Sequence, residues 1–303
     1  MSTLTPSAWF ITGCSPGGFG HYLALELLAN SIPVIVSARD PSKLSGLVEK
    51  GAKAVQFDVN DDEDILAQKA KEVDALVEGG VEVLVNNAGF GVWGSAEEQD
   101  FSTFRSIFET NVFGLVKTTR AFLPLLRTRR TGTIVNLSSI AGLEGGAGYS
   151  AYAAAKHAVE GFSDSLAKEV AHLGLRVQIV NPGYFRTNFL SPTSTTAIGP
   201  LADYLPVTQP LEAGLTAYAN NQPGDPVLGA RAMVDAVLGR GAAEGIEWIG
   251  GGEGAERLIL GPDAVQVMEG KVKKAKGDLE RWRGISEGTD LEEVKEEKRR
   301  AAK

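Results

Sequence analysis

The sequence has little of the chemistry that builds disulfides, metal sites or membrane anchors. Cys14 is the single cysteine, so no internal disulfide can form. The histidines are His21, His157 and His172 and lie scattered through expected helices. Their spacing is not that of metal ligands, so we expect no metal site. No apolar run approaches the ~20 residues that span a bilayer. The start of the chain lacks a basic segment followed by an apolar core, so no secretory signal is expected and the cytoplasm is the expected location.

Positive charge is also scarce. Lys and Arg total 30 against 38 Asp and Glu, which leaves a net charge of −8 and argues against a nucleic-acid partner. The chain has 303 residues and 43% of them are hydrophobic, as is usual for globular proteins. It is therefore long enough to bury a large core.

Short apolar runs alternate with segments of helical pattern along most of the chain. This pattern predicts an α/β protein with a doubly wound parallel sheet (a Rossmann fold), helices on both faces and a single domain. The expected strands are Ala8–Thr12, Pro33–Ser37, Ala54–Phe57, Val81–Val85, Gly132–Leu137, Leu175–Val180 and Arg257–Leu260. Within the predicted domain, residues 1–260, the irregular segment 182–226 is expected to cover a substrate. Residues 261–303 are expected to form a C-terminal helix and a charged tail.

Tyr152 and Lys156 are the residues around which a functional hypothesis can be built. Their spacing of four places them on one face of an expected helix, where an ammonium group lowers the pKa of a phenol. Ser139 follows the fifth expected strand, thirteen positions before Tyr152, so that both hydroxyls can reach one substrate oxygen. Tyr and Lys at this spacing are also common surface neighbours, and the pair alone does not establish an active site. Tyr149 lacks a lysine four residues later.

A glycine-rich loop follows the first expected strand, in the segment Thr12-Gly-Cys-Ser-Pro-Gly-Gly-Phe-Gly20. Glycines between a strand and a helix let backbone amides approach a pyrophosphate at the helix N-terminus. A surface turn uses the same residues. The strand–loop–helix context favours the nucleotide site.

The end of the second expected strand bears on the choice of cofactor. An acidic side chain there would hold the ribose diol of NAD, whereas Ala38 and Arg39 offer a small residue and a cation that suit the 2′-phosphate of NADP. A solvated arginine in a turn is the alternative. Asp58 and Val59, after the third expected strand, are placed to meet the adenine, although Asp58 also fits a helix cap.

Two further polar positions stand out. The motif Asn86-Asn-Ala-Gly89 ends the fourth expected strand, where asparagine also fits a purely structural turn. Asn111 lies inside the long expected helix 101–130. Such a residue usually faces solvent or kinks the helix. Its functional interpretation is that it holds the helix open around a water in a proton relay.

Together and in this order, these motifs resemble the short-chain dehydrogenase/reductase family. The motifs are TGxxx(x)GxG, NNAG, an Asn in the long helix, Ser followed by YxxxK, and Pro182-Gly-Tyr-Phe-Arg-Thr187. The resemblance is strong from Ala8 to Thr187. It extends more loosely through Leu260–Ala264, a region similar to ketoreductase-like members. The family loop has three residues between its first two glycines, whereas four separate Gly13 from Gly18. Either Pro16–Gly17 forms a bulge or the register shifts, which leaves the role of Ser15 open.

The resemblance implies a role for each matching residue. Tyr152 would donate a proton in reduction or accept one in oxidation, Lys156 would lower its pKa and bind the nicotinamide ribose, and Ser139 would orient the substrate oxygen. Asn111 would complete a catalytic tetrad. Cofactor binding is also implied for Gly13, Ser15, Gly18, Phe19, Gly20, Asn86, Phe185 and Thr187. These residues would bind the cofactor together with Tyr152, Lys156, Arg39, Asp58 and Val59.

The expected function is therefore an NADP(H)-dependent oxidoreductase that interconverts a ketone and a secondary alcohol. The expected partner is a small carbonyl or alcohol substrate, and the long helices 101–130 and 149–173 are available for a homodimer or homotetramer. Two alternatives remain at this point. One is a non-redox isomerase, dehydratase or cyclase on the same fold, and the other is a non-catalytic NADPH-sensing regulator.

Overall fold

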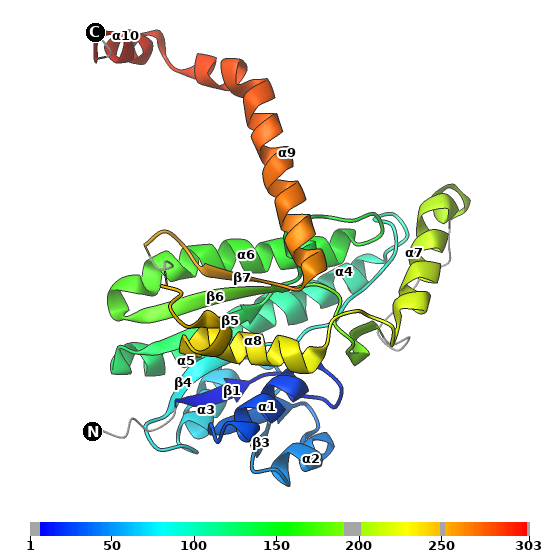
Figure 1. Ribbon diagram of the computed structural model, residues 1–303, viewed down its shortest axis with the longest axis vertical. Coiled ribbons are helices and arrows are strands. Elements are labelled where there is room, and N and C mark those ends of the chain that lie inside the picture. The colour runs from blue at the N-terminus through cyan, green and yellow to red at the C-terminus, as the bar shows by residue number, and fades with distance from the viewer. Residues whose placement is uncertain (1–6, 191–200, 249–251, 302–303) are drawn as a thin grey trace.

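Seven strands form one parallel sheet, in the order β3-β2-β1-β4-β5-β6-β7 (Figure 1). The structure is a computed structural model that describes residues 7–190, 201–248 and 252–301. The strand order reverses between β1 and β4, and such a switch point opens a crevice beyond the carboxyl ends of the strands. The strands are β1 Ala8–Ile11, β2 Val34–Ala38, β3 Lys53–Gln56, β4 Val81–Asn86, β5 Gly132–Leu137, β6 Leu175–Pro182 and β7 Glu256–Leu260.

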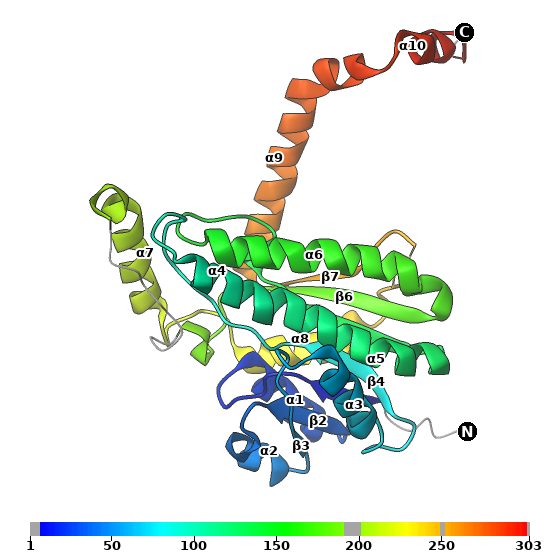
Figure 2. The same cartoon turned by 180° about the vertical axis from the view of Figure 1, so that it is seen from behind.

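Helices cover both faces of this sheet, which confirms the doubly wound α/β prediction. Helices α1 and α8 lie on one face, and α3, α4, α5 and α6 lie on the other (Figures 1 and 2). The helices are α1 Phe19–Ala29, α2 Ser45–Val48, α3 Glu63–Asp74, α4 Phe101–Phe108, α5 Leu115–Arg129, α6 Ser150–Val170, α7 Leu205–Tyr218, α8 Pro226–Leu238, α9 Pro262–Ser286 and α10 Glu292–Ala301.

The side-chain alternation of β1 shows how one short strand holds both layers of the core. Trp9 and Ile11 are fully buried against α1 and α8. Phe10 points to the opposite face, where its ring stacks on Phe122 of α5 at a centroid distance of 5.1 Å. Because successive side chains of a strand point to opposite faces, apolar residues at all these positions require a sheet covered on both sides.

The long helix predicted over residues 101–130 is interrupted. Helix α4 passes into a π-helical segment, Glu109–Gly114, before α5 begins. Such π-turns bulge the backbone outward and are frequent at functional sites. Asn111, the polar residue singled out in the sequence, lies inside this segment.

Two helices project from the body. No residue of α7 is buried, and α9 leaves the edge of the sheet with only Ala264 buried (Figures 1 and 2). Part of the expected substrate cover, 191–200, lies outside the described residues, and the weak helical pattern near Leu211 corresponds to α7. None of the helices in the described part of the chain is both long enough and apolar enough for a membrane crossing.

Candidate functional site

A cavity of about 910 Å³ lies at the carboxyl ends of the central strands. Most of the residues selected from the sequence line it, although they come from distant parts of the chain. The selected residues that line the cavity are Gly13, Ser15, Gly18, Phe19, Arg39, Asp58, Val59, Ser139, Tyr152, Lys156, Phe185 and Thr187. Asn111, Asn86 and Gly20 are not part of its wall.

The extra residue of the glycine-rich loop is accommodated in a tight turn. The amide of Gly18 donates to the carbonyl of Ser15 at 3.0 Å, with Pro16 and Gly17 between them. Gly17 has φ +74°, so Pro and Gly occupy the two central positions of a type II turn, the residues that this turn prefers. The bulge interpretation of Pro16–Gly17 therefore describes the loop, and helix α1 begins immediately after Gly18.

The N-terminus of α1 is suited to an anion. Gly18, the N-cap, provides no side-chain hydrogen bond, and the first turn carries no acidic residue. The first amides of a helix have no partner within it and attract negative charge. Gly13 has φ +71°, and a Cβ there would lie 2.8 Å from Cα of Ala88. The loop thus brings bare backbone to the cavity, as a pyrophosphate site requires.

Asn87, rather than Asn86, reaches this loop. The side-chain nitrogen of Asn87 donates to the carbonyls of Thr12 and Gly13 at 2.7 and 2.8 Å. Asn87 also lines the cavity. Asn86 is buried and donates to Thr119 and Asn136 on the α5 side of the sheet. Asn86, which was expected at the adenosine side of a cofactor, therefore lies outside the cavity wall, and Asn87 lines it.

Gly20 also acts from outside the cavity wall. It lies in the first turn of α1, where a Cβ would come within 2.5 Å of Nδ2 of Asn87. The absence of a side chain lets α1 approach the end of β4. Gly20 therefore shapes the loop without lining the cavity.

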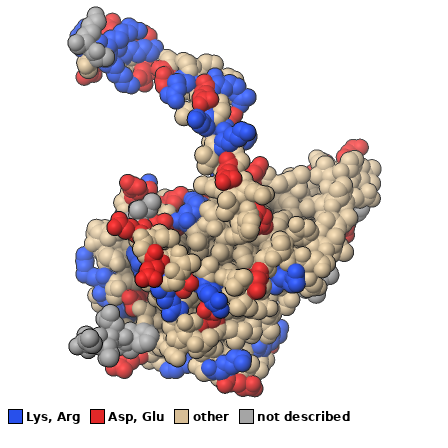
Figure 3. Space-filling view, viewed as in Figure 1, with Lys and Arg blue, Asp and Glu red and all other residues tan. Residues whose placement is uncertain are grey.

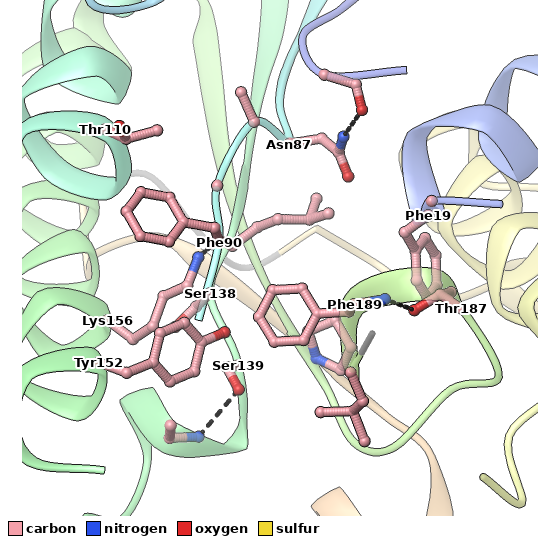
Figure 4. Close-up of a pocket in the computed structure, with 18 of the residues that line it drawn as sticks. Phe19, Asn87, Phe90, Thr110, Ser138, Ser139, Tyr152, Lys156, Thr187 and Phe189 are labelled. Atoms are coloured by element: carbon pink, nitrogen blue, oxygen red, sulfur yellow. Dashed lines mark hydrogen bonds between the residues drawn. The ribbon is translucent and has the colours of Figure 1, made fainter. Parts of the chain in front are cut away.

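The hydroxyls of Ser139 and Tyr152 lie close together and point toward one another at the wall of the cavity (Figure 4). Ser139 follows β5 and caps a short 3₁₀ turn, its hydroxyl accepting from the amide of Ala141 at 3.1 Å. Tyr152 and Lys156 lie one turn apart on α6. The amine of Lys156 donates to the carbonyl of Leu137 at 2.7 Å and lies 5.8 Å from the centroid of the Tyr152 ring.

Burial sets the protonation of this pair. It raises the pKa of Tyr152, and a hydrogen bond from Ser139 opposes the rise only in part. It lowers the pKa of Lys156 to about 8, against the opposing charge of Glu160. The expectation that the ammonium lowers the pKa of the phenol thus fails here, because desolvation outweighs it. Tyr152 keeps its proton at neutral pH.

Glu160 is a buried carboxylate that the sequence analysis did not select. It lies one helical turn beyond Lys156 and accepts hydrogen bonds from the hydroxyl of Ser138 and from the side-chain nitrogen of Asn181. Arg257 of β7 forms an ion pair with it. This network joins α6 to three neighbouring strands behind the Tyr–Lys pair. The signal available in the sequence was the continued spacing of four from Tyr152 through Lys156 to Glu160.

Asn111 holds the cavity wall through the backbone of Phe90. Its side-chain oxygen accepts from the amide of Phe90 at 3.0 Å, and its side-chain nitrogen donates to the carbonyl of Phe90 at 2.8 Å. Phe90 lines the cavity beside Tyr152 (Figure 4). The structure therefore shows Asn111 as a clamp between the π-helical segment and the loop after β4.

Replacing Asn111 with Ala is expected to lower the free energy of unfolding by about 2 kcal/mol, because two backbone groups of Phe90 lose their partners. Urea denaturation measures the change. Asn60→Ala is the matched control, since this exposed amide bonds Thr110 of the same segment at 3.1 Å and is expected to change stability by less than ~0.5 kcal/mol. Equal effects of the two substitutions would contradict the clamp.

Lys156 leads to a prediction about stability. Its pKa is lowered from 10.5 to about 8, so between these pH values the unfolded chain holds a proton that the folded chain has released. Stability rises with pH where the unfolded state binds more protons. Relative to Lys156→Met, the free energy of unfolding of the wild type is expected to rise by about 3 kcal/mol from pH 8 to pH 10.5. Urea denaturation of both proteins isolates this lysine, and a constant difference would contradict the burial effect.

Aromatic side chains line the half of the cavity near Tyr152. The Trp93 ring packs against Tyr149 and Tyr152 at centroid distances of 5.1 and 6.1 Å, and Phe189 lies 5.8 Å from Tyr152. The hydroxyls of Tyr149 and Tyr184 are 3.4 Å apart. Trp93 follows β4, Tyr184 and Phe189 follow β6, and Tyr149 is the N-cap of α6. They make an apolar wall around the two facing hydroxyls.

The other half of the cavity contains the ends of β2 and β3. Ala38, Arg39, Asp58 and Val59 all line it, and Arg39 is exposed. The Phe19 and Phe185 rings also line the cavity and pack edge to face at 5.2 Å. An elongated ligand with one charged and one flat end fits this order of glycine loop, cation and aromatic rings. A nicotinamide dinucleotide has this chemistry.

The chain belongs to the short-chain dehydrogenase family. The family model for short chain dehydrogenases matches residues 7–197. Among curated proteins, the oxidoreductase BOA17 of Botryotinia fuckeliana is 33% identical over 92% of this chain and 97% of its own length. A short-chain dehydrogenase structure from Streptomyces avermitilis has a TM-score of 0.82 at 36% identity, covering 96% of this chain and all of that chain.

A second solved structure bears on the cofactor. The NADP-bound structure of ElxO has a TM-score of 0.63 at 25% identity and covers 84% of this chain and 96% of that chain. Solved relatives hold NADP in some cases and NAD in others. The family therefore supports an oxidoreductase with a nicotinamide cofactor. The choice between the two dinucleotides depends on this chain's own residues.

Proposed function

We propose that this protein is an NADP(H)-dependent reductase of bulky, apolar ketones. The observation that carries the proposal is the meeting of two hydroxyls, from Ser139 and Tyr152, inside a cavity that continues to the glycine loop. Neutral hydroxyls are donors to a carbonyl oxygen. The aromatic wall around them favours a substrate with a large apolar surface.

The cofactor would lie along the cavity. The N-terminal amides of α1 would hold the pyrophosphate, Arg39 the 2′-phosphate, and Asp58 with Val59 the adenine. Phe185 and Thr187, after β6, would border the nicotinamide, and Lys156 would bind its ribose. The bound cofactor supplies hydride to the carbonyl carbon, and the protein supplies position and a proton.

A Tyr152 that carries its proton fits catalysis in the direction of reduction. A phenol that keeps its proton can donate it to the oxygen on which negative charge develops. Ser139 would donate a second hydrogen bond to that oxygen and stabilise the charge. Lys156, close to the ring, favours the phenolate that remains after the transfer. Asn111 would act through Phe90 by keeping the wall in place.

The direct test is consumption of NADPH, followed by its absorbance, with a panel of ketones of increasing apolar size. Secondary alcohols are the expected products, and large apolar ketones are expected to have lower KM values than small polar ones. A product without net reduction would support an isomerase or dehydratase instead. NADPH binding without turnover of any carbonyl compound would support a regulatory protein.

A further inference from the structure

Helix α9 carries an apolar stripe that the described residues of the body leave largely exposed. The stripe follows a heptad pattern, with positions seven apart occupied by Val265, Val272 and Leu279, and a second set occupied by Met268, Ala275 and Trp282. Val265, Val272, Leu279 and Trp282 are between 43% and 57% exposed. Three successive heptads of this kind are typical of a helix that pairs with another helix.

The glycines of α9 follow the same period on the opposite side. Gly270, Gly277 and Gly284 are seven residues apart, and a Cβ added at any of them would meet no atom within 4 Å. Glycine is a weak helix former, so a projecting helix with three of them gains little stability by itself. Packing of the stripe against a partner would supply the helix stability that the glycines remove.

The base of α9 is held in place. Asp263, in its first turn, accepts from the amide of Tyr184 at 2.7 Å. A shallow groove of about 440 Å³ runs beside this base, lined by Ile259 of β7, by Val265, Met268 and Val272 of the stripe, and by the charged residues Glu269, Lys273 and Lys276. Because β7 is the last strand of the sheet, the groove opens at the edge of the body. A large apolar side chain from outside could fill it.

We propose that the α9 stripe is an interface with a second copy of this chain, in which the two α9 helices pack antiparallel. In this arrangement Val265 lies opposite Trp282 of the second copy, Met268 opposite Leu279, and Val272 opposite Ala275. The Trp282 side chain of each copy then enters the groove at the base of the other copy's α9. The long α9 holds the two bodies at opposite ends of the pair.

The charges beside the stripe select this orientation. Figure 3 shows cationic and anionic side chains mixed along α9. In the antiparallel pair, Glu269 lies near Lys276 of the second copy and Lys271 lies near Asp278, so all the flanking pairs attract. In a parallel pair, Lys271 would face Lys276 and only Asp278 would meet a cation, Arg283. Within the described residues, Glu269, Lys271 and Lys276 form no ion pair of their own.

The association is tested by the mass of the full-length protein in solution. Sedimentation of the wild type is expected to show a species of twice 32.0 kDa, or a higher multiple. The variant V272E/L279E is expected to have half the mass of the wild-type assembly, because the α9 interface no longer forms. G270E/G277E is the matched control, because it adds the same charges at the same spacing on the opposite side of α9, and it is expected to associate like the wild type. Circular dichroism and NADPH binding check that each variant is folded.

The orientation is tested by exchanging charges. Lys276→Glu is expected to weaken the dimer at least tenfold, because it places two glutamates together, and E269K/K276E is expected to restore it. Strengthening by Lys276→Glu would instead indicate a parallel pair and overturn the proposed arrangement. A wild type that stays monomeric, or association unchanged by V272E/L279E, would overturn the interface. Flotation of a monomeric wild type with phosphatidylserine vesicles would assign the stripe to a membrane surface.

Discussion

Replacing Tyr152 with Phe is expected to reduce kcat for ketone reduction by about 10²–10⁴-fold, the contribution usual for a proton donor positioned in the transition state. The substitution removes one oxygen and keeps the ring that packs against Trp93 and Phe189. Burial keeps this phenol protonated, so the lost group is the acid of the proposed reaction. NADPH affinity is expected to stay within about threefold, because the cofactor gains most of its binding elsewhere in the cavity.

Tyr149→Phe is the matched control for this prediction. Tyr149 lines the same cavity and its hydroxyl lies 3.4 Å from that of Tyr184, but Ala153 stands where a lysine would follow it. Its loss is expected to affect KM more than kcat. Single-turnover measurement of NADPH oxidation separates the chemical step from binding for both variants. Comparable losses of kcat in the two variants would remove Tyr152 from the role of acid.

The sequence predicts the sheet well because its signal is local. Each strand is a short apolar run between turn residues, and a strand covered on both faces needs no fixed alternation to be recognised. The Tyr152–Lys156 spacing likewise determines a shared helical face before any tertiary contact is known. The bend near Asn111 was suggested by a polar residue in a helix, but the π-helical segment depends on a contact with the backbone of Phe90, 21 positions away in the sequence.

The position of Asn86 outside the cavity wall is a consequence of the alternation of side chains along β4. The fourth strand was expected to end at Val85, whereas β4 continues through Asn86. Because side chains alternate along a strand, one added residue carries Asn86 to the α5 face and leaves Asn87 to reach the glycine loop. The local sequence pattern does not determine the end of a strand to within one residue. A motif with two adjacent asparagines therefore did not reveal which one faces the cavity.

The pKa of Tyr152 could not be predicted because burial is a property of the whole fold. The helical spacing correctly brings an amine near the ring, at 5.8 Å from its centroid. The same packing removes water from the phenol and directs the amine to the carbonyl of Leu137. Desolvation then favours the neutral phenol over the phenolate. The exposed stripe of α9 is a second case, since only the structure shows that nothing in the described chain covers it.

Replacing Arg39 with Leu is expected to weaken NADPH binding by about 10- to 150-fold, the range of a lost charge-assisted hydrogen bond of ~1.5–3 kcal/mol, and to leave NADH binding nearly unchanged. Arg39 is exposed at the cavity wall directly after β2, and Ala38 beside it leaves room for a phosphate. Because the two dinucleotides differ only in the 2′-phosphate, their ratio of dissociation constants reports this one contact. Fluorescence titration with each nucleotide measures that ratio.

Lys43→Leu controls for a general loss of positive charge, because Lys43 is exposed on the next turn of chain and does not line the cavity. It is expected to change the ratio of NADPH to NADH affinity by less than about twofold, since exposed charges separated by solvent interact weakly. Adding Ala38→Asp to Arg39→Leu is expected to reverse the preference, because a carboxylate repels the 2′-phosphate and accepts hydrogen bonds from the free ribose diol of NADH. If Arg39→Leu weakened both dinucleotides equally, Arg39 would act on the shared pyrophosphate or on the loop itself, and the assignment of NADP would lose its basis.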